Sequence, residues 1–470
     1  MSRQRCWITG EIEVLTPLHV GSGTFREIAV VKGKEGSNEP KPGVAAIVRD
    51  FEDRPFIPGT AVKGLLLRLA ARLGNDARRA HLFGAAKKDG GGNMGAAIVR
   101  GLVWTSPGNT QNLPYAAGCA AAANDTAKGL GPGVFVSART AINRQTGTAE
   151  ENKLFFQEMV APGARLALQI LVEDRSEPGS GMASGSLEAD VAAIRAVLKQ
   201  LEHSNGQAIG KNETDGLGRI RLVKSPALKF ERLGESGDFE PFTPKLAPLA
   251  NFDATPQPVW SRRLKLVCEG PFLIVDSSYT ESGRDVPQNV GQRTALDLPL
   301  LLGSSLSGAL RARARWLAAL DESRAGRNPE NVDRPDKIVR KLEDAQDLTP
   351  VERLFGVTGF RGLLQIDEIK IEKAAEFCIS SVKLDRFTGG PMDNALFKTR
   401  AHRDVHVAVV LRLADHVRSK VPATQMSELE EDKALLDKLL KDICKDGLVL
   451  GHGGSKGFGW FKVAVEGAKP

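Results

Sequence analysis

Two short segments combine residue types that suit contact with nucleic acid. The segment "RFTGGPMDNALF", residues 386–397, begins with an arginine and an aromatic residue and ends in a Leu-Phe pair. The segment "RQTGTAEENKLF", residues 144–155, has nearly the same form. An arginine at the base of a projecting loop can pair with phosphate, and an apolar or aromatic tip can wedge between bases. A structural turn would explain the glycines but not the repeated arginine and Leu-Phe pair, so we expect two projecting hairpins or loops.

A glycine-rich segment near the end of the chain offers a second set of anion contacts. It reads "LGHGGSKGFGWF", residues 450–461, and includes His452 and Lys456. Glycine lets backbone N–H groups approach a phosphate closely and adopt positive φ. The segment matches neither the phosphate loop of nucleotidases nor the dinucleotide fingerprint. A long hairpin with flexible turns is an equally good interpretation, and both stay open.

Two helix starts form a third set. "IPGTAVKGLLLRLAARL", residues 57–73, and "LLGSSLSGALRARARWL", residues 301–317, each open a helix with Gly and small polar residues. Unpaired N–H groups at such a start favour an anion, and Lys63, Arg68 or Arg311 would lie one or two turns further on. An ordinary cap followed by a solvated basic face explains the same residues.

These motifs recur in the same order, which indicates that the chain repeats one plan. The other shared landmarks are "LFG" at 82–84 and 354–356, and "DGLGRIRL" at 215–222 with "KGFGWFKV" at 456–463. A stretch rich in Pro and Gly separates the two copies. We therefore predict a first domain over residues 1–233, a linker over 234–260 and a second domain over 261–470.

Each copy alternates strands and helices in a β-α-β-β-α-β order. Helices are expected over residues 59–73 and 186–203 in the first copy, and over 303–320 and 427–444 in the second. This order predicts an α+β fold with two tandem ferredoxin-like, or RRM-like, domains that carry long insertions.

Composition sets limits on the class of protein. The 470 residues are 41% hydrophobic and 26% charged, with a formal net charge of +7, which is typical of a globular protein and compatible with a polyanionic partner. No apolar run is long enough to cross a membrane, and the basic N-terminal stretch lacks the apolar core of a secretory signal. Five cysteines without a CxxC pair favour a reducing compartment, so we expect a cytoplasmic protein without a membrane partner.

Taken together, the motifs resemble the CRISPR-associated RAMP superfamily, and more closely the backbone subunits of type III effector complexes. The resemblance rests on "TPLHVGSG", "PFIPGTAVKGLLLRLA", "RTAINRQTGTAEENKLF" and "GLGRIRL" in the first copy, and on "GSSLSGALRARARWL", "LDRFTGGPMDNALF" and "GHGGSKGFGWF" in the second. A fusion of two such domains is similar to the multi-domain backbone proteins of type III-D systems. The resemblance implies a ferredoxin-like palm and a thumb that kinks the guide–target duplex. It also implies three partners: the crRNA guide, the target single-stranded RNA and the other subunits of a type III complex.

The resemblance also points to a cleavage site. Cleaving members of the family carry an Asp in a loop between the first strand and the helix-opening motif, often as Asp-x-Pro. The second copy has Asp285-Val286-Pro287 in this place, whereas the first copy has no Asp-x-Pro. The resemblance therefore implies that Asp285 is catalytic and holds Mg²⁺ or Mn²⁺, with Arg284 beside it to steady a phosphate. A turn capped by Asp285 explains the same residues without catalysis.

The predicted RNA contacts come from all of these motifs. They are His19, Ser22, Lys63, Arg68, Arg144, Thr146, Arg219, Arg284, Ser304, Ser305, Arg311, Arg386, Phe387, Thr388, His452 and Lys456. Three other functions remain open: a backbone subunit without catalysis, a stand-alone guide-processing endonuclease that uses His19, and a scaffold that binds no RNA.

Overall fold

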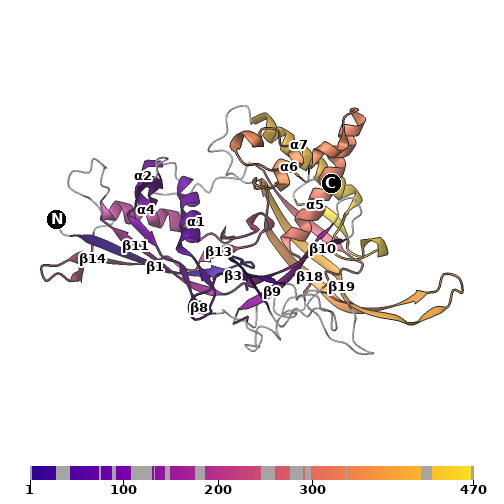
Figure 1. Ribbon diagram of the computed structural model, residues 1–470, viewed down its shortest axis with the longest axis horizontal. Coiled ribbons are helices and arrows are strands. Elements are labelled where there is room, and N and C mark those ends of the chain that lie inside the picture. Colours follow the sequence, from indigo (N-terminus) through magenta and orange to yellow (C-terminus); the bar gives the residue numbers. More distant parts are fainter. Residues whose placement is uncertain are drawn as a thin grey trace.

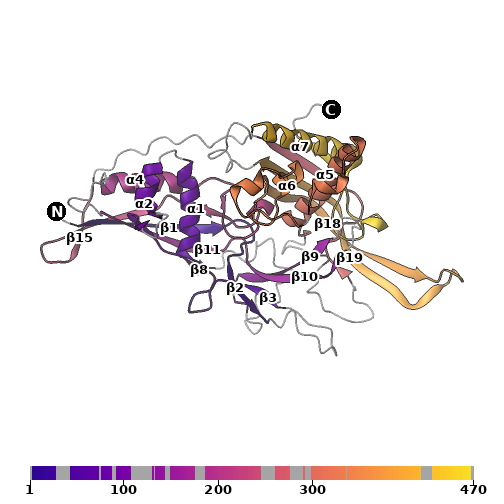
Figure 2. The same ribbon diagram turned by 45° about the horizontal axis from the view of Figure 1, so that its top comes forward.

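A computed structural model gives the arrangement of the chain (Figure 1). It describes residues 3–27, 43–72, 76–86, 92–106, 130–131, 133–142, 149–174, 186–244, 260–275, 289–291, 298–334, 336–413 and 426–466. Two mixed α+β domains follow one another, and in each one the helices cover one face of a sheet (Figures 1 and 2). No helix in these ranges is both long and apolar enough to cross a membrane.

The first domain has a nine-stranded main sheet with the order β12-β13-β1-β11-β8-β4, to which β7, β14 and β15 are added. Its strands are β1 (Gln4–Val14), β4 (Phe56–Ile57), β7 (Ala97–Val99), β8 (Leu102–Ser106), β11 (Arg165–Glu173), β12 (Gln207–Ala208), β13 (Arg219–Leu222), β14 (Ala227–Leu233) and β15 (Phe239–Pro241). The helices are α1 (Gly59–Ala71), α2 (Asp76–Phe83) and α4 (Leu187–Lys199). A second sheet contains β2 (Gly21–Arg26), β3 (Val44–Ile47), β9 (Val134–Ile142) and β10 (Ala149–Val160), and β5 (Ala85–Ala86) pairs with β6 (Gly92–Asn93).

The second domain repeats the plan with fewer strands. Its sheet has the order β17-β19-β16-β21-β20, with β18 paired to β19. The strands are β16 (Ser261–Cys268), β17 (Asn289–Val290), β18 (Leu364–Leu384), β19 (Pro391–Leu413), β20 (Leu448–Val449) and β21 (Trp460–Val465). The helices are α5 (Gly303–Arg324), α6 (Pro350–Phe355) and α7 (Met426–Asp446), with short 3-10 turns η4 (Pro329–Val332) and η5 (Leu342–Ala345).

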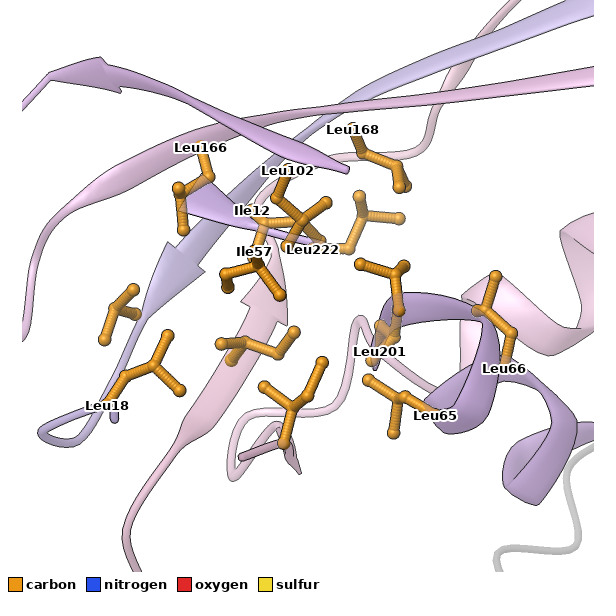
Figure 3. Packing of buried hydrophobic residues seen from close by; sticks show 14 of the residues in the cluster. Ile12, Leu18, Ile57, Leu65, Leu66, Leu102, Leu166, Leu168, Leu201 and Leu222 are labelled. Carbon is orange, nitrogen blue, oxygen red and sulfur yellow. The ribbon is translucent and has the colours of Figure 1, made fainter. Parts of the chain in front are cut away.

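The four helices expected from the sequence are present, and all four bury apolar residues against a sheet. In α1 the buried residues Leu65, Leu66 and Leu69 follow the helical period, so that one face of the helix packs on the sheet. Figure 3 shows Leu65 and Leu66 in one cluster with Ile12 and Leu222 from the strands. Helix α5 runs to Arg324, one turn further than the sequence pattern predicts.

The strand order is compatible with the predicted ferredoxin-like plan. In the second domain the order β18-β19-β16-β21 places the first strand of the β-α-β-β-α-β unit beside its third and fourth strands, all antiparallel. In the first domain β8, β11, β1 and β13 have the same arrangement.

Ordered structure of the first domain continues into the stretch that the sequence predicts as a linker. Strand β15 pairs with β14, and Phe242 packs edge-on against Phe230 with ring centroids 5.8 Å apart. Trp260, at the other end of that stretch, is buried in the core of the second domain. A polar, Pro-rich composition does not exclude a short hairpin, because the contact between Phe242 and Phe230 is enough to hold this one against the sheet.

Candidate nucleic-acid interface

A long hairpin projects from the second domain. Strands β18 and β19 stay paired from Leu364 and Leu413 at the base to Leu384 and Pro391 at the tip, and they extend well away from the sheet (Figures 1 and 2). The prediction of a projecting hairpin at residues 386–397 is therefore confirmed for this domain.

The turn of this hairpin presents an aromatic side chain to solvent. An Asp385 carboxylate oxygen accepts hydrogen bonds from the backbone N–H groups of Phe387 (2.9 Å) and Thr388 (2.8 Å), and these bonds hold the pKa of Asp385 below its ordinary value. Thr388 also donates its hydroxyl to the same oxygen at 3.1 Å. Phe387 is 99% exposed as a result, and Arg386 next to it is exposed too. A rigid turn of this kind can present a side chain without losing much conformational entropy when it binds.

More exposed apolar residues lie along the shaft of the hairpin. Val382 and Leu396 face each other across the two strands, and Leu384 and Phe397 lie nearby in the register. Exposed apolar groups in a row mark an interaction surface rather than a core.

The first domain carries a related but shorter hairpin. Strands β9 and β10 pair from Val134 and Val160 to Thr140 and Leu154 and, after a register shift, again at Ile142 and Ala149. Leu154 and Phe155 are about half exposed. Arg144 and Thr146, which the sequence assigns to RNA binding, lie outside the described residues.

His19 is buried at the base of the smaller sheet. Its Nδ1 lies 2.7 Å from the backbone oxygen of Glu158, and since a carbonyl only accepts, Nδ1 carries the proton. Burial lowers the pKa of His19. Ser22, further along β2, is exposed and lies with its Oγ 2.7 Å from the hydroxyl of Thr24.

Two predicted phosphate contacts are already paired with carboxylates of this chain. Arg68 binds Glu213 at 2.7 Å, and Arg311 holds Asp333 with both ends of its guanidinium at 2.6 and 3.1 Å. These pairs give both arginines a structural role; the predicted contact with RNA stays a prediction. Lys63 is half-buried on α1.

The start of α5 contacts the first domain. A Cβ added to Gly303 would overlap the backbone oxygen of Asp215, so the loop of the first domain lies directly against the first helical residue. Ser307, one turn along, interacts with the Asp215 carboxyl group and counteracts the rise in the pKa of Asp215 that burial causes. Ser304 and Ser305, predicted to bind a phosphate, are half-buried beside this contact.

Two ion pairs join the two domains at this contact. Arg219 of β13 is 6% exposed and pairs with Asp367 of β18, which also binds Arg412 at 2.9 Å. Arg361 of the second domain binds Glu213 of the first at 2.9 Å. Arg219, a predicted RNA contact, therefore lies at the junction between the domains.

One basic residue that the sequence analysis missed lies next to this junction. Arg139 of β9 is half-buried, and its Nε and Nη2 are buried atoms that have no hydrogen-bond partner among the described residues. Burial lowers the pKa of Arg139 and raises the pKa of Asp215, while each charge counteracts the shift of the other. The positive charges of Arg139 and Lys211 also act on His19. The only signal for Arg139 in the sequence was a charged residue within a strand of otherwise uncharged residues, because an arginine at this position is not repeated in the second copy.

The glycine-rich loop of the second domain is open to solvent. Its 3-10 turn η8 (Gly454–Lys456) lies between two glycines with positive φ, Gly453 and Gly457. His452 and Lys456 are both exposed.

The predicted catalytic segment lies outside the described residues. Asp285 and Arg284 fall in the gap before β17, where the chain resumes with Asn289 beside Thr399 of the projecting hairpin. Within the described ranges, His, Cys, Asp and Glu do not gather in any group of three or more that could hold a metal ion.

The family of the chain follows from comparison with known families. The model of the RAMP superfamily matches residues 11–221 and 266–462, so the chain belongs to this superfamily. The two matched regions correspond to the two α+β domains. Membership indicates a CRISPR-associated, RNA-binding function in a multi-subunit complex. No curated protein matches the chain.

Proposed function

We propose that this chain is a guide-RNA-binding backbone subunit of a type III effector complex, made of two ferredoxin-like domains whose hairpins kink the guide–target duplex. The observation that carries the proposal is the β18–β19 hairpin, with Phe387 exposed at its tip, on a domain of the RAMP superfamily. A rigid aromatic tip can unstack neighbouring bases and hold the duplex open. Basic residues on the palm would contact the RNA backbone, so sequence is read by base pairing rather than by this chain.

The proposal includes cleavage of the target RNA in the second domain. A kinked strand would place a ribose 2′-OH in line with the adjacent phosphorus. The 2′ oxygen loses its proton and attacks phosphorus, the bond from phosphorus to the 5′ oxygen breaks, and the 5′ oxygen takes a proton from water, so that a 2′,3′-cyclic phosphate and a 5′-hydroxyl remain. Alignment alone supplies a large part of such a rate gain. Asp285 would accept the 2′-OH proton or bind a hydrated metal ion beside the phosphate.

Mg²⁺ or Mn²⁺ fits this role by its chemistry. A carboxylate is the hard oxygen ligand that these ions prefer, and the ion neutralises negative charge on the reacting phosphate. The described residues add no carboxylate cluster, so Asp285 would bind the ion together with RNA oxygens and water.

The Phe387→Ala variant tests the wedge. We expect target affinity of the guide-loaded complex to fall about 5- to 150-fold, because stacking on one base contributes about 1–3 kcal/mol. A fluorescent adenine analogue at the displaced position should also lose its unstacked signal. Phe51→Ala is the matched control, since Phe51 is 94% exposed on a turn of the first domain. Equal effects of both variants would contradict the wedge.

Salt dependence tests binding through the RNA backbone. The affinity of the chain for single-stranded RNA should fall linearly with salt on logarithmic axes, with a slope of about 0.7 for each phosphate contacted. The Arg386→Ala variant should lower this slope by about 0.7, the contribution of one phosphate contact. The control is Arg327→Ala, which removes an exposed arginine paired with Glu322 and should leave the slope unchanged. An affinity independent of salt would instead favour a scaffold without RNA.

His19 provides the test of the guide-processing alternative. A processing endonuclease should cut precursor guide RNA without other subunits and lose that activity in His19→Ala. We expect the isolated chain not to cut, because His19 is only 4% exposed and already donates its Nδ1 proton to a backbone oxygen.

A further inference from the structure

The contact between the two domains is directional. The closing loop of the first domain, defined here as residues 212–218, lies against the start of α5 and against β18 of the second. The other side of the contact consists of a helix start whose first residue, Gly303, has no room for a side chain. Because the two sides differ, the contact is heterologous and can in principle be repeated from domain to domain.

The second domain repeats the closing loop but leaves it open. The equivalent residues 453–459 have the same αL positions on both sides of a 3-10 turn. A Cβ on Gly216 would lie 2.8 Å from the backbone oxygen of Ile366, whereas a Cβ on Gly457 would meet no atom of the described residues within 4 Å. Trp460, which aligns with the buried Arg219, is 56% exposed. An exposed tryptophan beside an open loop is typical of an unfilled protein interface.

The start of α1 in the first domain is covered by the end of β7 and the turn that follows it. A Cβ on Gly59, the first residue of α1, would overlap the backbone oxygen of Val99. In a helix the backbone fixes the direction of each Cα–Cβ bond. Val99 therefore lies on the same side of the start of α1 as Asp215 does at the start of α5. Strand β8, just after that turn, pairs with β4 immediately before α1. Another closing loop therefore has no access to α1.

Charge also excludes a second copy as the partner. At the contact within the chain, Ser307, the fifth residue of α5, lies beside the carboxyl group of Asp215 and lowers its pKa against the effect of burial. The open loop has Lys456 where the first domain has Asp215, and α1 has Lys63 where α5 has Ser307. Two copies joined head to tail would place these two lysines together, which is unfavourable in a partly desolvated contact.

We propose that the open closing loop, residues 453–459 with Trp460, docks a different chain of the same superfamily. The docked helix begins with glycine or another small residue, because the loop backbone occupies the Cβ position, and it carries a carboxylate near its fifth residue to pair with Lys456. This chain thus grows an assembly in one direction only, from its second domain. The inference rests on the multi-subunit assembly of the proposed function. It adds the direction in which the assembly grows and the chemistry of the partner surface.

Binding between purified proteins tests the inference without RNA. The full chain is immobilised and exposed in turn to each other RAMP-superfamily protein encoded in the same locus. We expect one of them to bind, Ser455→Trp to weaken binding at least 100-fold by bulk on the open loop, and Lys456→Asp to weaken it about tenfold. Lys441→Asp, an exposed lysine on α7, is the matched control and should bind as the unaltered chain does.

A carbodiimide cross-link adds the position of the contact. It should join Lys456 to an acidic residue in the first two turns of a partner helix, and the chain alone should sediment as a monomer. The inference is overturned if no such protein binds, if Ser455→Trp and Lys456→Asp bind normally, or if a dimer of this chain forms through the loop. Single-stranded RNA affinity is measured in parallel. If the two variants lose RNA binding but keep protein binding, the loop is an RNA-binding element. If the unaltered chain binds the other protein but no RNA, the proposed function is contradicted while the inferred protein contact stands.

Discussion

The Asp285→Ala variant of the guide-loaded complex is expected to lose one specific cut in the target RNA and to keep guide and target binding. A single positioned acid, base or metal ligand contributes about 10²- to 10⁴-fold to such a reaction, so the rate at that position should fall by this factor. The products of the unaltered complex should end in a cyclic phosphate and a 5′-hydroxyl. Removal of divalent ions should abolish the same cut.

Controls separate catalysis from assembly. Glu39→Ala is the matched variant, because Glu39 precedes Pro40 in the first copy but lacks the Asp-x-Pro spacing. It should cut normally. Asp285→Asn keeps the shape of the side chain and should cut as poorly as Asp285→Ala if the charge is needed. If all three variants cut like the unaltered complex, the chain is a backbone subunit without catalysis.

The Arg219→Met variant is expected to destabilise the junction between the domains by about 3–5 kcal/mol. This is the usual effect of removing one partner of a buried ion pair, since the remaining charge has lost its compensation. Arg412 still contacts Asp367 at 2.9 Å, which places the expected loss at the lower end of that range. Urea unfolding followed by tryptophan fluorescence measures the loss as an earlier transition, which need not be two-state in a two-domain chain.

The double variant Arg219→Met, Asp367→Leu tests the cause. It should recover part of the lost stability, because the buried carboxylate that had lost Arg219 is removed. The recovery should be incomplete, because Arg412, whose side chain is 27% exposed, loses Asp367 as well. Arg327→Met removes an exposed pair with Glu322 and should change the free energy of unfolding by about 0–1 kcal/mol. A single Arg219 variant as stable as this control would mean that Arg219 is not needed at the junction, and its predicted contact with RNA would then become the better account.

The sequence alone determined the features that local patterns and repetition encode. The helical period of Leu65, Leu66 and Leu69 placed α1, and the recurrence of the motifs along the chain indicated two domains. The expectation of a projecting hairpin at residues 386–397 followed from the repeated Arg-x-Thr-Gly segment with its Leu-Phe pair, and the glycines of that segment favour a turn. These inferences needed only neighbouring residues or a comparison of one half of the chain with the other.

Only the tertiary structure decided which partner each charged side chain has. Arg219 is 148 residues from Asp367 along the chain, and no spacing rule connects them. Arg219 was predicted to contact RNA because it lies in a motif that recurs in the two halves of the chain. In the fold its guanidinium pairs with a carboxylate of the other domain instead. In the same way, the turn after β7 covers α1 while the equivalent start of α5 receives the closing loop. Which of two similar surfaces is covered depends on how segments that are distant in the sequence pack against it, and that is set by packing across the whole molecule.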